Sequence, residues 1–553
     1  MTQPDGARGG ENRMWRWAMI WLLVPGSGWA SEAYSTDGFA PGDEPAGVVL
    51  EGHVTFSASG LSLTMITNAP FMPAIPHDLP TIEVDLVRRG QDLLPVQRGL
   101  VTSAHPVFDY FVSPGRVWSE GEYAHASLPF TLMNRIVNCA HNGLLTFRYT
   151  ATRIEEVRVL VNQETCHFTK FDLWGEGLAR YTPGPVAGAD ATRAAFASEQ
   201  AQRIPTKPLA ALATDYGADL ALLLTGLPTN DDLTTAGVYF EGTHYTTPCN
   251  TRGGAHPYCG HMLLTSFSTA KTAFPALVLM SLAQRDGPEV YRQRIIDHLP
   301  EARSAKGDWQ RVTFDQVGDM TSGNFSDGAP LADASPGNFY SDLGRNGKLA
   351  AAFGWPNRAD AGSRFVYQTA DTFILVNALD HYLRGDSFDY LVETIMKPLH
   401  LPPEVMVSRR TRDHEQNNSG TAFGGMGMWW TGDAIVKLAR FLSIEDGRIE
   451  GRQVLHPQAL AATLQRDPGD RGIQTGVGAT FYNNGTWALP ARVLGERFAC
   501  DPWVPFMTGL SGVRVTMMPN DMIFYYFNDA QAFPLEESVI AADQVRPFCA
   551  RTR

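Results

Sequence analysis

The pattern of apolar residues divides the chain into an N-terminal part with short strand-like runs and a later part with helical runs as well. From about residue 46 to 182, short runs rich in Val, Thr, Tyr and Phe, such as "TIEVDLVRR" and "LLTFRYTATRIEEVRVLVN", lie between Gly, Pro and Asn breaks. β-branched and aromatic residues bounded by such breaks are typical of short strands. We therefore expect an all-β N-terminal domain over residues 46–182.

The next stretch marks a boundary. "TPGPVAGADATRAAFASEQAQRIPTKP" begins with turn-forming residues, continues with an Ala-rich run after Asp190, and then meets Pro205 and Pro208. Alanine favours a helix and proline ends one. Residues 183–208 are therefore predicted to be a linker with a short helix.

Helical and strand patterns are mixed from residue 209 to 553. "AFPALVLMSLAQ", "DTFILVNALDHYL" and "DAIVKLARFL" have helical spacing, whereas "GVYFEGTHYTT" predicts a strand and "SGVRVTMMPNDMIFYYFND" a hairpin that turns at "PND". Helices combined with antiparallel strands predict a second domain of the α+β class. A chain of 553 residues also exceeds the size of a single core.

Charge and motif content exclude several function classes. The formal charge is -13 and no run of Lys or Arg offsets it locally, so we expect no nucleic-acid or anionic-lipid partner. The chain has no P-loop, no His-Glu-x-x-His and no Cys-x-x-Cys, and its His residues are scattered. We therefore expect neither a cofactor nor a metal.

The N-terminus indicates export. Arg13 and Arg16 precede a short apolar stretch, a Pro/Gly break and small residues around Ala30. This order is typical of a secretory signal peptide over residues 1–30, and the apolar run is shorter than the roughly 20 residues of a membrane span. We expect a secreted or periplasmic protein with no membrane span in its mature form; a buried or disordered N-terminus is the alternative.

The cysteines fit the same compartment. They form three sequence-neighbouring pairs, Cys139 with Cys166, Cys249 with Cys259, and Cys500 with Cys549. Disulfides persist in exported proteins, and pairing between neighbours is the simplest of the connectivities that six cysteines allow. Free, buried cysteines are the other interpretation.

One spacing suggests covalent catalysis. In "SFSTAKTAFPALVLM", Lys271 lies three positions after Ser268 at the start of an apolar helix. Positions i and i+3 share a helix face, and apolar surroundings lower the pKa of a lysine, so Lys271 can be the base that a serine nucleophile needs. Pro275 offers no N–H to the Lys271 carbonyl and predicts a kinked or loosened helix here. An exposed helix face is the alternative, because Ser-x-x-Lys is common.

Five ordered elements resemble the serine β-lactamase and DD-peptidase superfamily, in particular the branch of class C β-lactamases, β-lactamase-like esterases and 6-aminohexanoate-dimer hydrolases. The elements span residues 235–545. After the Ser-x-x-Lys helix come Thr313 with Thr321-Ser322-Gly323, then Tyr367-Gln368-Thr369 where the family has Tyr-x-Asn, then Gly424-Gly425, then Met507-Thr508-Gly509 where the family has Lys-Thr-Gly or His-x-Gly. The resemblance implies a β-lactamase-like serine hydrolase domain over residues 209–553, an antiparallel sheet flanked by helices.

The resemblance also implies a role for each matching residue. Ser268 would be the nucleophile of an acyl-enzyme, and Lys271 and Tyr367 would share the general-base work, through a neutral lysine or through a phenolate. The backbone N–H groups of Ser268 and Leu510 would form the oxyanion hole. The implied substrate contacts are Thr369, Met507, Thr508 and Gly509.

Two substitutions alter those substrate contacts. Thr369 stands where an Asn usually meets the substrate amide, and Met507 replaces a cationic or imidazole residue that meets a substrate carboxylate. Arg514 could take over from Met507, although an exposed strand arginine is the simpler interpretation. Trp429 and Trp430 either line an acyl pocket or pack in the core. The substitutions favour less charged esters or amides over β-lactams.

The leading hypothesis is an exported serine hydrolase that cleaves a small-molecule carboxylic ester or amide. Esterase, oligomeric amide hydrolase, D-amino-acid peptidase and β-lactamase follow in decreasing order of preference. The alternative is a catalytically weak or inactive protein of this fold that binds a ligand or partner. An α/β-hydrolase is a third possibility, disfavoured because the chain has no Gly-x-Ser-x-Gly elbow and ends in antiparallel-looking strands.

Overall fold

The computed structural model describes residues 35–229, 231–331, 333, 335–413, 418–495, 497–498 and 500–549. The predicted signal peptide lies outside these residues. Over the described part of the chain, no helix combines the length and the apolar character that crossing a membrane requires.

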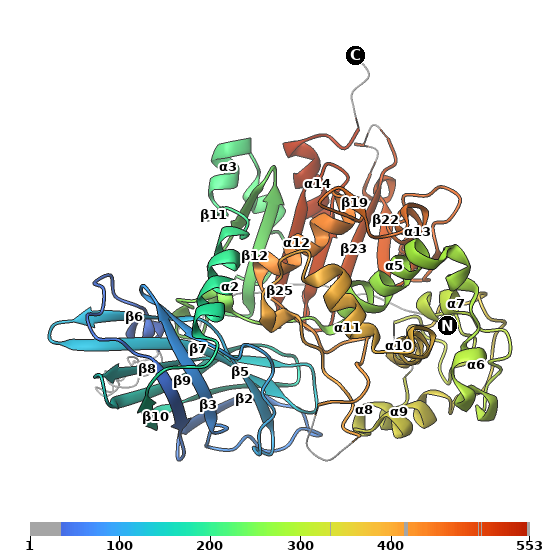
Figure 1. Cartoon of the computed structure of the whole chain (residues 1–553). Coiled ribbons are helices and arrows are strands. Elements are labelled where there is room, and N and C mark those ends of the chain that lie inside the picture. The colour runs from blue at the N-terminus through green and yellow to red at the C-terminus, as the bar shows by residue number, and fades with distance from the viewer. Residues whose placement is uncertain are drawn as a thin grey trace, which may run out of the picture.

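Residues 52–183 form one antiparallel sheet that closes on itself, because β1 pairs with both β3 and β10 (Figure 1). Its strands are β1 (Gly52–Ser57), β2 (Ser62–Asn68), β3 (Ile82–Arg89), β4 (Asp92–Pro95), β5 (Phe108–Val112), β6 (Gly115–Glu120), β7 (Tyr123–Asn134), β8 (Ala140–Tyr149), β9 (Ile154–Thr165) and β10 (Thr169–Pro183). We call this the N-terminal sheet.

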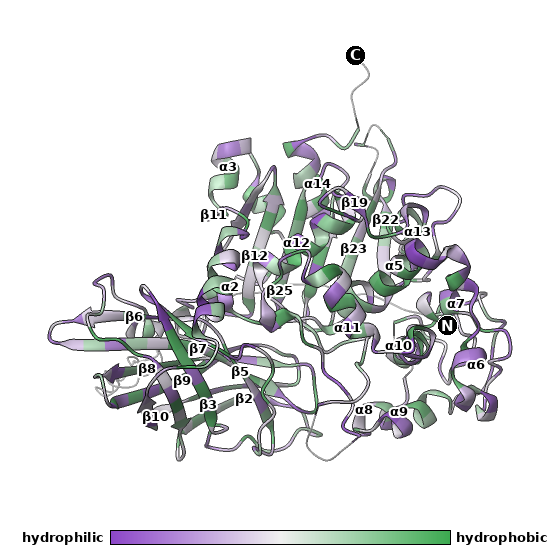
Figure 2. Ribbon diagram, in the orientation of Figure 1, coloured by the Kyte–Doolittle hydropathy of each residue, from purple (hydrophilic) through white to green (hydrophobic). Residues whose placement is uncertain are grey.

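The period-two pattern of these strands explains which face is buried. In β3, Ile82, Val84 and Leu86 are buried while Glu83 and Asp85 are exposed, and Figure 2 shows the matching alternation of hydrophilic and hydrophobic positions. The buried side chains fill the inside of the sheet so completely that the gap beside them has no room for a water molecule.

A second sheet runs through the C-terminal part of the chain, in the order β11-β13-β12-β25-β24-β23-β22-β21-β20; its pairs are antiparallel except β11 with β13, which is parallel. Its strands are β11 (Thr206–Pro208), β12 (Leu233–Phe240), β13 (Thr243–Thr246), β20 (Ile473–Gln474), β21 (Phe481–Asn483), β22 (Thr486–Pro490), β23 (Trp503–Gly509), β24 (Val513–Met517) and β25 (Ile523–Asn528). The predicted hairpin is confirmed as β24 and β25. The single strand expected in "GVYFEGTHYTT" is instead two strands, β12 and β13, which turn at Glu241 with a φ of 45°.

Helices cover both faces of this second sheet. The α-helices of the described residues are α2 (Ala189–Ala201), which packs on the N-terminal sheet, and α3 (Ala211–Tyr216), α4 (Leu220–Leu223), α5 (Leu277–Asp286), α6 (Ile295–His298), α7 (Phe314–Gly318), α8 (Gly337–Ser341), α9 (Arg345–Ala352), α10 (Thr369–Leu383), α11 (Ser387–Leu391), α12 (Gly432–Ser443), α13 (Pro457–Thr463) and α14 (Glu536–Val545). No side chain of strand β25 is exposed, because helices cover it on both faces. Tyr525 and Phe527 pack toward α5, α10 and α12, whereas Phe524 and Tyr526 pack toward α3, α4 and α14.

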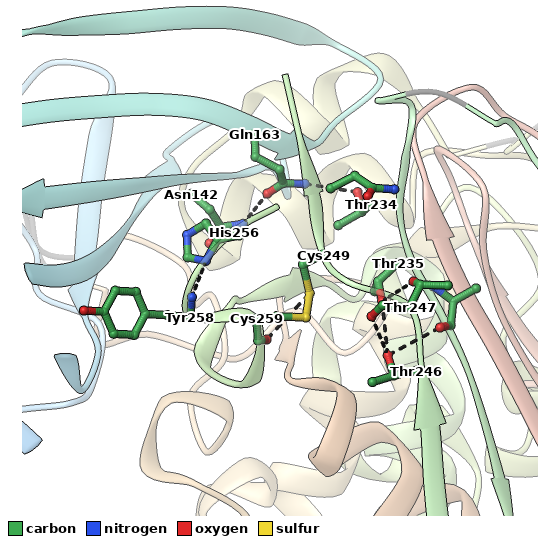
Figure 3. The surroundings of a disulfide bond; sticks show 12 residues. Asn142, Gln163, Thr234, Thr235, Thr246, Thr247, Cys249, His256, Tyr258 and Cys259 are labelled. Atoms are coloured by element: carbon green, nitrogen blue, oxygen red, sulfur yellow. Dashed lines mark hydrogen bonds between the residues drawn. A yellow bond between two sulfur atoms is a disulfide. The ribbon is translucent and has the colours of Figure 1, made fainter. Parts of the chain in front are cut away.

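Buried polar contacts join the N-terminal sheet to the rest of the chain. Arg98, after β4, makes a bidentate pair with Glu404 at 2.7 Å and a second pair with Glu199 on α2. In Figure 3, Gln163 of β9 donates to Thr234 of β12 at 3.0 Å. A mostly buried Arg–carboxylate pair is costly to break, so the two parts are fixed against each other.

The cysteines adopt the simplest of the pairings that the sequence allowed. Disulfides join Cys139 to Cys166, Cys249 to Cys259, and Cys500 to Cys549. The first two lie close to the junction between the two sheets, and Figure 3 shows the surroundings of the second.

Candidate active site

Ser268 lies on the first turn of a helix whose pitch changes along its length. The segment leaves the short strand β16 (Leu264–Thr265), which pairs with β17 (Trp429–Trp430), and winds as a 3₁₀ turn over Phe267–Thr269. A π turn over Thr272–Ala276 contains Pro275 and precedes α5. The predicted loosening after Lys271 is therefore a π turn. Its wider hydrogen-bond spacing accommodates Pro275, which has no N–H to donate.

Lys271 is enclosed directly behind Ser268. Its side chain is 2% exposed, whereas Ser268 is half-buried, and Nζ lies 3.0 Å from Ser268 Oγ. Nζ also lies 3.0 Å from the Gly425 carbonyl oxygen and 3.1 Å from Thr369 Oγ1. Burial lowers the pKa of Lys271 to about 8, against the opposing effect of the Asp333 carboxylate. A large fraction of Lys271 is therefore neutral near pH 8.

The neighbours of Nζ fix where its hydrogens point. A carbonyl oxygen only accepts, so Gly425 takes one N–H. Thr369 Oγ1 donates its own hydrogen to Asp333 Oδ2 at 2.6 Å, so it must accept the second. A neutral amine then has only its lone pair left, and that lone pair faces the Ser268 hydroxyl. This is the arrangement in which Lys271 can take the serine proton.

Asp333 is the functional candidate that sequence analysis missed. Its carboxylate accepts from the Thr369 backbone N–H at 3.0 Å, from Thr369 Oγ1 and from the Tyr340 hydroxyl. Loss of solvation acts to raise the pKa of Asp333. The charge of Lys271 and hydrogen bonds from Ser335, Thr369 and Tyr340 outweigh this effect, so the pKa of Asp333 is lowered. Asp333 belongs to no motif, and only its place near the other residues reveals it.

Tyr367 stands beside the pair. Lys271 Nζ lies 4.7 Å from the centre of the Tyr367 ring, and the tyrosine is half-buried among Tyr482 and Trp487. Burial raises the pKa of Tyr367, and a hydrogen bond with Ser268 acts in the opposite direction. A raised pKa keeps the phenol protonated, so this geometry favours a hydroxyl that donates over a phenolate base.

The end of β23 packs against the backbone of the serine. A Cβ at position 509 would lie 2.9 Å from Phe267 Cβ and 3.1 Å from Ser268 N, so only glycine lets the strand approach this closely. Leu510 follows directly and is 38% exposed. The structure therefore brings the backbone of residue 509 next to the Ser268 N–H.

The other residues of the Met-Thr-Gly stretch differ in exposure. Thr508 is half-buried and its hydroxyl donates to the Val513 carbonyl at 3.1 Å, whereas Met507 has no exposed surface and packs in the core. The expectation that Arg514 is exposed is wrong. It is buried on β24 and donates to the Phe533 carbonyl at 2.9 Å, because both faces of this central strand are covered.

The tryptophan pair packs in the core and does not line an acyl pocket. Neither Trp429 nor Trp430 is exposed; Trp429 packs against Phe111 of the N-terminal sheet, and Trp430 donates to Thr269 Oγ1 at 3.1 Å. The glycine loop before them shapes the site, since a Cβ at Gly425 would lie 2.6 Å from Thr369 Cγ2. Its carbonyl also contacts Lys271, a role that the sequence did not indicate.

No family model matches this chain, and no curated protein matches it. Solved structures do resemble it. A putative 6-aminohexanoate-dimer hydrolase from Bacillus anthracis is 15% identical over 61% of this chain and 80% of its own, with a TM-score of 0.42. A D-stereospecific amidohydrolase from Streptomyces sp. is 18% identical over 59% and 98%, with a TM-score of 0.42. A class C β-lactamase is 17% identical over 59% and 94%, with a TM-score of 0.41. These structures come from the superfamily that the sequence motifs resemble.

Proposed function

We propose that this protein is a serine hydrolase of the β-lactamase-like type that cleaves a carboxylic ester or amide through an acyl-enzyme on Ser268. The observation that carries the proposal is the placement of a buried lysine, with its pKa lowered to about 8, 3.0 Å from a half-exposed serine hydroxyl. Two hydrogens of Lys271 Nζ go to Thr369 Oγ1 and the Gly425 carbonyl, which leaves the third position of the nitrogen facing Ser268. A purely structural role does not require this orientation.

Acylation begins when neutral Lys271 takes the proton of Ser268 as Oγ bonds to the substrate carbonyl carbon. The backbone N–H groups of Ser268 and Leu510 hold the oxyanion that forms. The intermediate then collapses: the bond to the alcohol or amine breaks, and the leaving group takes the proton back from Lys271. Tyr367, kept protonated by its raised pKa, is placed to relay that proton.

Deacylation repeats these steps with water. Water adds to the acyl carbon and gives its proton to Lys271, and Ser268 leaves with that proton as the carboxylic acid is released. Thr508 and Gly509 lie beside the reacting carbonyl in this arrangement. Thr369 acts from behind Lys271, because its hydroxyl is held between Nζ and Asp333.

An ester or amide without a carboxylate fits these residues better than an anionic β-lactam. Met507 is enclosed in the core and Arg514 donates to a backbone carbonyl, so neither is free to pair with a substrate carboxylate. We therefore keep esters first and β-lactams last. Export is proposed as well, because three disulfides persist in an oxidising compartment.

A purely ligand-binding role for the N-terminal sheet has less support. Apolar side chains fill its inside, and the gap lined by Phe56, Leu145 and Val159 has no room for a water molecule. That gap is therefore too small to hold a small molecule.

The test is intact-protein mass spectrometry after exposure to an activated ester and, separately, to a serine-reactive phosphonate. A stoichiometric adduct on the wild type that Ser268→Ala abolishes is expected. Ser281→Ala is the matched control, because Ser281 is a serine of the following helix whose hydroxyl forms a hydrogen bond with Tyr390 and not with Lys271. It should label like the wild type. A folded wild type that takes no adduct would overturn the proposal.

A further inference from the structure

The N-terminal sheet reaches the candidate active site through one side chain. Asn138 lies in the turn between β7 and β8, is 1% exposed, and directly precedes Cys139, whose disulfide to Cys166 fixes the turn to the end of β9. Both cysteines pack in the core of the second part of the chain. Asn138 is therefore held rigidly inside a region to which its own strands do not belong.

The amide oxygen of Asn138 gathers donors from two separate segments. It accepts from the Phe267 N–H at 2.9 Å, from the Gly427 N–H at 3.0 Å and from the Ser266 hydroxyl at 3.2 Å. Backbone N–H groups can only donate, so oxygen, and not the NH₂ group, must face them. The NH₂ group has no partner among the described residues. Asn138 therefore acts at this position through its amide oxygen, as a hydrogen-bond acceptor.

These two segments carry the parts of the proposed catalytic pair. Phe267 directly precedes Ser268, and its φ of 40° is a left-handed conformation that costs a non-glycine residue about 1–3 kcal/mol unless its surroundings hold it. Gly427 lies two residues after Gly425, whose carbonyl takes one hydrogen of Lys271. One oxygen thus links the turn that presents the nucleophile to the loop that orients the base.

We propose that Asn138 is a positioning residue for acylation, through which the N-terminal sheet sets the distance between Ser268 Oγ and Lys271 Nζ. This inference rests on the proposed function for its effect on rate. Its structural part stands alone: without the oxygen, the Phe267 turn and the Gly427 loop lose their shared acceptor, and holding the two segments together is left to the neighbouring contacts between Ser266 and Met428 and between β16 and β17.

Three variants of the full chain separate positioning from general stability. Asn138→Leu keeps the size and removes the acceptor. Asn138→Asp keeps an acceptor oxygen and exchanges the unpartnered NH₂ for a second carboxylate oxygen, and a carboxylate that accepts two or three such donors stays ionised when buried. Gln163→Leu removes another buried polar contact between the same two parts, to Thr234, without touching the Ser268 turn (Figure 3).

The readouts are the rate of Ser268 labelling by the phosphonate, kcat and KM on an ester that labels Ser268, and amide hydrogen exchange of peptides covering residues 264–270 and 424–430. For Asn138→Leu we expect labelling and kcat to fall at least about tenfold with little change in KM, and exchange to speed up in both peptides. Asn138→Asp should stay within about threefold of the wild type and Gln163→Leu within about twofold.

Several outcomes would overturn the inference. Wild-type labelling and exchange in folded Asn138→Leu would do so, as would an equal rate loss in Gln163→Leu. If Asn138→Leu does not fold, Asn138→Ala is judged by the same criteria, and unprotected amides in the wild-type peptides would refute the inference without any variant. A wild type that takes no label would refute the proposed function alone, because the exchange comparison still decides whether Asn138 holds the two segments.

Discussion

Replacing Lys271 by methionine tests the proposed base most directly. The substitution keeps an unbranched side chain that is one atom shorter and removes the group that lies 3.0 Å from Ser268 Oγ. Loss of a positioned general base slows a reaction by about 10²–10⁴-fold. Labelling of Ser268 and ester turnover should both fall by that factor, while the fold is retained.

The same substitution should also change stability with a definite sign. Enclosure lowers the pKa of Lys271 from 10.5 to about 8, which corresponds to about 3 kcal/mol of destabilisation when the amine is charged. Methionine removes that cost but leaves the buried Gly425 carbonyl without its partner, a loss of about 1 kcal/mol. The variant is therefore expected to be about 2 kcal/mol more stable than the wild type at pH 7.

The pH dependence follows from the two pKa values. The unfolded chain binds one more proton than the folded chain only between pH 8 and 10.5, so the wild type gains stability as pH rises through this range. The methionine variant lacks this gain. Its advantage should be full below pH 8 and gone above pH 10.5.

Urea unfolding at pH 7 and pH 10, together with phosphonate labelling, measures both effects. Lys348→Met is the matched control, because Lys348 is equally buried, has its pKa lowered to about 8 and contacts the Phe339 carbonyl rather than a serine. It should show the same trend in stability and label at the wild-type rate. Wild-type labelling by folded Lys271→Met would refute the assignment of the base.

Three further changes should have distinct signatures. Tyr367→Phe should lower kcat by about 10²-fold on esters with poor leaving groups and slow phosphonate labelling less, because only the former need a relayed proton. Asp333→Asn should move the acid limb of the pH–rate profile to lower pH, since the Asp333 carboxylate raises the pKa of Lys271 and its removal lets that pKa fall. Glu404→Gln should cost about 3 kcal/mol in urea unfolding by leaving Arg98 underpaired, less if Glu199 compensates, with little effect on labelling.

Local patterns predicted the parts of the structure that depend on neighbours in sequence. Runs rich in β-branched and aromatic residues between Gly, Pro and Asn breaks indicated strands, and the break at "PND" located the β24–β25 hairpin. The i to i+3 spacing brought Lys271 onto Ser268, and Pro275 explained the π turn that follows. Each of these outcomes rests on steric rules that act within one turn or one hairpin.

Contacts between distant segments could not be predicted in this way. Asp333 lies outside any helix or strand, and Asn138 precedes a cysteine in a turn of another sheet, so no periodicity marks either residue. Arg514 looked exposed because charged residues usually are, yet a central strand covered on both faces buries every side chain it carries. Such placements depend on how whole helices and strands pack against one another. Local patterns in a single sequence do not reveal that packing.

The replacement of asparagine by Thr369 makes chemical sense only together with Asp333. A lone threonine hydroxyl can donate or accept, so it cannot fix the direction of a neighbouring lysine proton. The Asp333 carboxylate removes that ambiguity, because it takes the Thr369 hydrogen at 2.6 Å and leaves Thr369 Oγ1 as an acceptor for Lys271. The same carboxylate adds a negative charge that is unbalanced whenever Lys271 is neutral. An anionic substrate would be repelled by that charge, and this repulsion links the changed motif to the proposed preference for uncharged acyl groups.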